Sequence, residues 1–201
     1  MNTQKLAVII VFVALTVALN PALTGVGVPA PYAPYLVYQI WEIPLVAVFL
    51  LYGPKYGISI AVLNTLVLLA IYMGPGGLPA APFYNLAAFL SMILGVFSAH
   101  KASNLRAGRQ GIKNIRVEYG TAVVVASTAL GIVLRTAIMS VVNYAVLGYG
   151  YPIGYSLPES AVLASLPFIA LFNATLALYT VPVGHVVANV VKSRLRLNNE
   201  K

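Results

Sequence analysis

One stretch decides the fold: residues 121–147 read TAVVVASTALGIVLRTAIMSVVNYAVL, with Arg135 as the one charged residue among them. About 20 apolar residues are enough for a helix to cross the hydrocarbon core of a bilayer. Five further apolar runs lie at about 6–23, 40–52, 57–73, 83–99 and 160–191. The sequence therefore predicts an all-α integral membrane protein, with six transmembrane helices in a single domain over residues 1–201.

The positions of the positive residues predict the orientation of these helices. Of the twelve Lys and Arg, all but Arg135 lie in short polar breaks or near the chain ends, and two apolar runs separate each of these sites from the next. The breaks at 24–39, 74–82 and 148–159 contain no Lys or Arg. Because cytoplasmic loops collect Lys and Arg, we expect a multi-pass protein of the cell membrane with cytoplasmic N- and C-termini.

The composition excludes several classes of protein. With 60% hydrophobic and 8% charged residues, the chain does not have the composition of a soluble globular protein. Its net charge of +8 lies beside the apolar runs, which favours contact with anionic lipid over nucleic acid. The absence of Cys and Asp excludes a thiolate nucleophile and a Ser-His-Asp triad. We therefore expect no enzyme, and we assign no catalytic residue, metal or cofactor.

Polar residues inside the apolar runs predict a ligand site. A central Arg costs about 2.5–3.5 kcal/mol on insertion scales, so Arg135 should face the protein interior. At a rise of about 1.5 Å per residue, several other polar groups fall at the middle or outer depth of their runs. With Arg135 the candidate ligand-binding residues are Glu42, Asn85, Asn143, Asn173, Tyr35 and Tyr38. They predict a pocket open to the outside that suits a planar, hydrogen-bonding solute with little or no charge.

Each of these residue types also has a structural interpretation. Tyrosines commonly form a belt at the membrane interface, and an Asn in a membrane helix often bonds a neighbouring helix. Arg135 could pair with Glu42 or with a backbone carbonyl. On this interpretation the chain is a non-transporting assembly subunit. An intramembrane enzyme using Glu42 and Arg135 would also need a nucleophile and a base within reach. It is disfavoured, because the available histidines, His100 and His185, lie near the inner ends of their helices.

The order of several short motifs resembles the S component of an energy-coupling factor (ECF) vitamin transporter, in its riboflavin-binding branch. The resemblance covers most of the chain, and its motifs correspond to the second to sixth helices of that branch. The motifs are EIPLV at 42–46, YGPKYG at 52–57, NLAA at 85–88, LRT at 134–136 followed by Met139 and Asn143-Tyr144, LPF at 166–168 and FN at 172–173.

The resemblance implies a protein that captures riboflavin or a related flavin from outside. It implies partners as well, namely an ECF transmembrane scaffold subunit driven by two cytoplasmic ATPase subunits. The scaffold would contact small residues of the first helix, matched here by Ala14, Ala18 and Ala22, while Asn143 and Asn173 would bond the ligand.

The sequence also departs from the riboflavin branch at two positions. Where that branch commonly carries Lys, this chain has Leu63 and Leu176. An S component for another small vitamin or a nucleobase is therefore an alternative.

Overall fold

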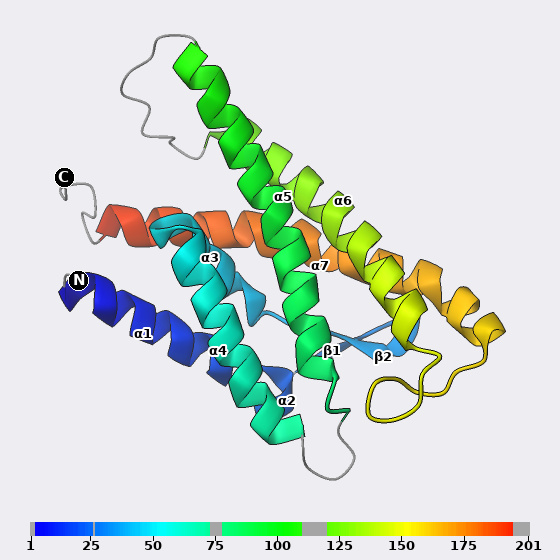
Figure 1. Ribbon diagram of the computed structural model, residues 1–201. Coiled ribbons are helices and arrows are strands. Elements are labelled where there is room, and N and C mark those ends of the chain that lie inside the picture. Colours follow the sequence, from blue (N-terminus) through cyan, green and yellow to red (C-terminus); the bar gives the residue numbers. More distant parts are fainter. Residues whose placement is uncertain (1–2, 26, 73–77, 110–119, 195–201) are drawn as a thin grey trace.

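The protein is described by a computed structural model covering residues 3–25, 27–72, 78–109 and 120–194 (Figure 1). The described part is mostly helical, with one small antiparallel sheet. Its elements are α1 (Thr3–Ala18), α2 (Pro21–Thr24), β1 (Val28–Ala30), β2 (Ala33–Tyr38), α3 (Glu42–Tyr52), α4 (Pro54–Tyr72), α5 (Ala81–Arg109), α6 (Thr121–Val146) and α7 (Glu159–Arg194).

Each predicted apolar run forms helix. The first run is split between α1 and the short α2, while the other five correspond to α3–α7. Three segments are long and apolar enough to cross a membrane: Ala81–Leu105 of α5, α6 and α7. The apolar helices of α1, α3 and α4 are shorter. The structure thus supports the helical part of the prediction, and six complete spans stay a prediction.

Two boundaries differ from those predicted. The helix expected at 83–99 continues to Arg109, because the polar residues that follow Ala99 include no Gly or Pro before Gly108 to interrupt it. The break at 24–39 begins at the last residue of α2 and contains the hairpin of β1 and β2. In this hairpin Val28 lies opposite Tyr38 and Pro29 opposite Val37.

The core of the protein is built around α3. Leu45, Val46, Ala47 and Val48 are completely buried, and α3 packs against α7, α4 and α1. Gly184 of α7 allows the close approach, since a Cβ atom there would lie 2.5 Å from Val46 Cγ1. α3 is therefore surrounded by protein, with α7 running across it (Figure 1).

The start of α1 and the end of α7 each carry a lysine and lie on the same side of the molecule (Figure 1). In Figure 1 the start of α1 and the end of α7 lie toward one side of the molecule, and the hairpin lies on the opposite side. Lys5 and Lys192 belong to the first of these ends.

Lys5 Nζ lies 4.0 Å from the ring centroid of Tyr56 and 5.1 Å from that of Tyr52, a cation–π contact joining α1 to α3 and α4.

The crossing of α5 and α6 brings the two helix backbones into direct contact. A Cβ atom at Gly95 would lie 2.5 Å from the backbone N of Gly131 and from the carbonyl of Leu130. Backbone atoms cannot move aside as a flexible side chain can, so a residue without Cβ is required at position 95. Small residues at such crossings let membrane helices pack through van der Waals contact.

We predict that Gly95→Ala destabilises the protein by about 1–3 kcal/mol, the usual cost of overpacking. The matched control is Gly131→Ala, because a Cβ there meets its nearest atom, Val181 Cγ2, at 3.4 Å. Thermal unfolding of both variants in mild detergent tests the crossing. Equal unfolding temperatures for the two variants would contradict it.

Candidate functional site

The structure contains a cavity of about 830 Å³ between the hairpin, the first turns of α5, the second half of α6, the residue 147–158 connection and the first half of α7. This volume lies within the range of about 300–1,000 Å³ typical of small-molecule sites. Its wall is mainly apolar and aromatic. The aromatic side chains are Tyr35, Tyr84, Tyr155, Phe168 and Phe172, and the polar ones are Gln39, Asn85, Arg135, Asn143, Ser165 and Asn173.

Arg135 is the most buried polar side chain of the wall, at 2% exposure. Its guanidinium binds the carboxylate of Glu42 through both terminal nitrogens; the Nη2 to Oε1 distance is 2.9 Å. Its Nε–H donates to Asn173 Oδ1 at 3.0 Å, and Nη1 lies 3.5 Å from Met92 Sδ. Four helices, α3, α5, α6 and α7, therefore meet at one guanidinium.

The carboxylate of Glu42 is fully buried in the first turn of α3. A negative charge is favourable at a helix N-terminus, and the bidentate pairing with Arg135 supplies further compensation for the lost hydration. Glu42 is not part of the cavity wall. Arg135 thus forms the pair with Glu42 that its structural interpretation predicts, and the same Arg135 side chain also lines the cavity.

All three asparagines of the predicted site lie in the wall, and Asn143 and Asn173 differ in their hydrogen bonds. Asn173 Nδ2 donates to the carbonyl of Ile169 at 2.9 Å, and its Oδ1 accepts from Arg135. Asn143 Nδ2 donates to the carbonyl of Met139 at 2.7 Å. In the described part of the chain, the Oδ1 of Asn143 has no partner. Asn143 is half-buried and free to accept a hydrogen bond from a ligand.

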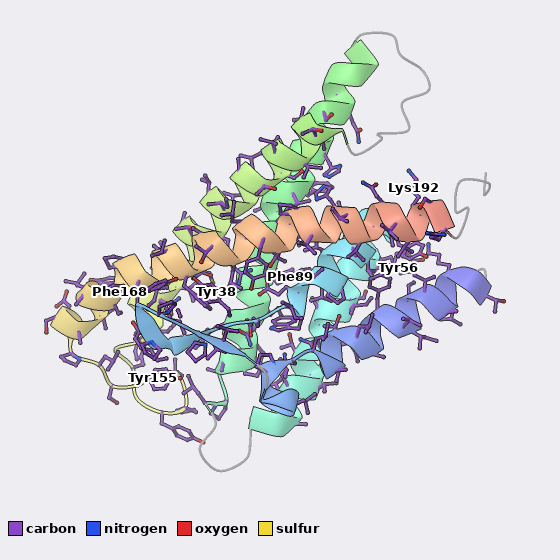
Figure 2. The ribbon with its side chains drawn as sticks, turned by 180° about the vertical axis from the view of Figure 1, so that it is seen from behind. Tyr38, Tyr56, Phe89, Tyr155, Phe168 and Lys192 are labelled. Carbon is purple, nitrogen blue, oxygen red and sulfur yellow. The ribbon has the colours of Figure 1, made fainter. Side chains whose placement is uncertain are left out.

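The two tyrosines predicted for the site both lie on β2 of the hairpin, and only one of them reaches the cavity. Tyr35 is 64% exposed and reaches the cavity wall. Tyr38 lies outside the wall: its hydroxyl bonds Tyr32 at 2.7 Å and Thr175 at 2.8 Å, and its ring lies 5.1 Å from that of Phe172. Because Thr175 and Phe172 belong to α7, Tyr38 holds the hairpin against that helix (Figure 2). Burial and, after it, the hydrogen bond to Tyr38 raise the pKa of Tyr32 above its usual value near 10, so the Tyr32 hydroxyl is protonated at neutral pH.

The connection between α6 and α7 closes another side of the cavity. The backbone N–H groups of Tyr155 and Leu157 donate to the carbonyl of Leu147 at 3.3 and 3.2 Å. The hydroxyl of Tyr84 on α5 donates to the carbonyl of Ile153. Asn85, one residue further along α5, is half-buried in the wall. The connection is thus ordered against both α5 and α6.

Several wall residues were not among the sequence-based candidates. Phe168 and Phe172 supply aromatic surface from α7, and Gln39 lies at the end of the hairpin. The available signal was spacing: Ser165, Phe168, Phe172 and Asn173 recur at intervals that place them on one face of a helix. Apolar residues at helical spacing occur on every face of such a helix, so the pattern does not single out this one.

A second polar contact lies away from the cavity. His100 and His185, which the sequence places near the inner ends of their helices, are stacked with ring centroids 5.5 Å apart and Nε2 atoms 3.3 Å apart. His185 is buried, and its Nδ1 lies 2.9 Å from the carbonyl of Val181. Among the described residues, no group of three His, Cys, Asp or Glu side chains could hold a metal ion.

The small residues expected to contact a partner helix lie on the first two helices. Ala14 and Ala18 of α1 are exposed, together with Ile10, Val11 and Leu15. Ala22 falls in α2, and its side chain lies outside the described residues. The partner contact stays a prediction.

We predict that Arg135→Met lowers the free energy of unfolding by about 3–5 kcal/mol, since it leaves a buried carboxylate without its partner. The double variant Glu42→Gln/Arg135→Met removes both charges and should recover part of this loss. Thermal unfolding of the purified proteins measures both effects. A double variant less stable than Arg135→Met would contradict the pairing argument.

No protein-family model matches the sequence, and a search of curated proteins finds no match. The fold, in contrast, has a relative among solved structures. The S component of a bacterial ECF transporter superposes with a TM-score of 0.60 and 20% sequence identity, over 100% of both chains. The chain therefore has the fold of an ECF transporter S component.

Proposed function

We propose that this protein is the substrate-capturing S component of an ECF-type importer, with riboflavin or a related flavin as its ligand. The observation that carries the proposal is the cavity of about 830 Å³, whose largely apolar and aromatic wall contains a few convergent polar groups. The shared fold supports it, because the similar solved structure is itself an S component.

The cavity chemistry suits a flat heterocycle with hydrogen-bonding edges. Phe168, Phe172 and the wall tyrosines offer surfaces on which an isoalloxazine ring can stack. The Oδ1 of Asn143 can accept from an imide N–H. A guanidinium has five N–H donors, and the contacts of Arg135 with Glu42, Asn173 and Met92 use four of them. The fifth, on Nη2, can donate to a ligand carbonyl.

Transport requires partners in this proposal. The sequence has no G-x-x-x-x-G-K-[ST] motif, so ATP hydrolysis by that route would come from two cytoplasmic ATPase subunits acting through an ECF scaffold in the cell membrane. The exposed small residues of α1, Ala14 and Ala18, would contact that scaffold together with Ala22.

The departures from the riboflavin branch lie outside the cavity wall. Leu176 is completely buried in the protein core, and Leu63 is 44% exposed on α4. Neither side chain belongs to the described wall. This placement supports a flavin ligand, with another small vitamin or a nucleobase as the alternative.

We predict that protein purified in mild detergent from cells grown in rich medium shows the absorbance bands of an oxidised flavin. Riboflavin added to ligand-free protein should lose fluorescence as it binds. A colourless protein that leaves riboflavin fluorescence unchanged would contradict the flavin assignment, and thiamine, biotin and nucleobases would be the next ligands to test.

A second prediction concerns Asn143. Asn143→Ala should weaken ligand binding by roughly three- to tenfold, the usual effect of one lost hydrogen bond, with little change in unfolding temperature. Asn173→Ala is a less clean probe because Asn173 also accepts from Arg135. Binding is measured by fluorescence quenching.

The matched control is Asn64→Ala, on a buried residue of α4 that lies outside the cavity wall. It should leave binding unchanged. If Asn143→Ala instead lowers stability and leaves binding intact, an assembly subunit is the better description of the protein.

A further inference from the structure

Among the described residues that line the cavity, Arg135 is the single side chain with a formal charge. The same guanidinium is paired with Glu42, which is 0% exposed and lies behind the wall. As a unit the pair is neutral. The wall therefore offers N–H groups to a ligand without offering a net positive charge.

We infer that Glu42 is a specificity-determining residue that sets the charge of the ligand, an inference that rests on the proposed ligand-binding function. With the carboxylate in place, an anionic ligand loses its hydration in an apolar cavity and gains no net attraction there. An uncharged ligand loses much less, so the cavity favours neutral ligands. Without the carboxylate, the guanidinium carries an uncompensated charge that an anion can neutralise.

Removing the Glu42 carboxylate would change the net charge at the cavity wall without moving any side chain. On a planar guanidinium, the Nη2–H that Glu42 does not use lies on the same edge as Nε–H, beside Asn173 Oδ1. Asn173 lines the cavity and is fixed by its bond to the Ile169 carbonyl. The charge of Arg135 therefore acts at the wall, while the group that balances it lies on α3.

The test compares riboflavin with riboflavin 5′-phosphate, which share a ring system and differ in charge. Wild-type protein should bind riboflavin more tightly. Glu42→Gln should shift the ratio of the two dissociation constants toward the phosphate by at least about tenfold at low ionic strength. The double variant Glu42→Gln/Arg135→Gln, again neutral, should return the ratio to the wild-type value.

The matched control is Glu159→Gln, which removes the same charge from an exposed residue in the first turn of α7. Its ratio should equal that of the wild type. If riboflavin binds the wild type and Glu42→Gln leaves the ratio unchanged, the inference is wrong while the proposed function stands.

A measurement without flavin separates the two hypotheses. If neither flavin binds the wild type, the proposed flavin function fails, and inorganic phosphate then tests Glu42 alone. Phosphate should raise the unfolding temperature of Glu42→Gln more than that of the wild type and Glu159→Gln, and equal shifts overturn the inference. If Glu42→Gln does not fold, the wild type alone still tests the inference: it should bind riboflavin more tightly than riboflavin 5′-phosphate at low ionic strength, and an equal or reversed preference overturns the inference.

Discussion

The structure depends on one buried ion pair, that of Arg135 with Glu42. Removing two charges from water is expensive, and the cost is offset only where the geometry is good and further hydrogen bonds complete it. Both conditions hold here, through bidentate pairing and through the contacts of Arg135 with Asn173 and Met92. Together with the Asn173 contact, the pair joins α3 to α6 and α7, two of the helices that line the cavity.

The cavity follows from how these helices meet. α5 and α6 touch backbone to backbone at Gly95 and Gly131. Beyond that crossing, toward the hairpin, the first turns of α5 and the second half of α6 supply wall residues, among them Ala88 and Met139. The hairpin and the 147–158 connection then enclose the space with aromatic side chains. A tight crossing at mid-helix and an ordered cover at one end together leave room for a ligand between them.

Much of this arrangement could be predicted from the sequence. Long apolar runs predicted the helices, and the cost of a lone charge in a membrane predicted that Arg135 faces the interior, with Glu42 as one of two candidate partners. The hairpin was missed because strands of three and six residues that contain prolines give little periodic signal. The contact of His100 with His185 joins residues 85 positions apart, which no local pattern reveals. Phe168 and Phe172 were missed because an apolar residue on an apolar helix does not reveal what it faces.

The burial of α3 has a consequence for how the protein would fit its membrane. Eleven residues of helix span only about 16 Å, roughly half the hydrocarbon thickness of a bilayer. A lipid-facing helix of this length would suffer hydrophobic mismatch, which bilayers relieve by thinning or tilting. Residues 44–49 of α3 are shielded by neighbouring helices, while Ile10, Leu94, Val133 and Leu178 on the outer helices are exposed. Bilayer thickness would therefore act on the outer helices, and the length of α3 is free to be set by the cavity that it helps to hold in place.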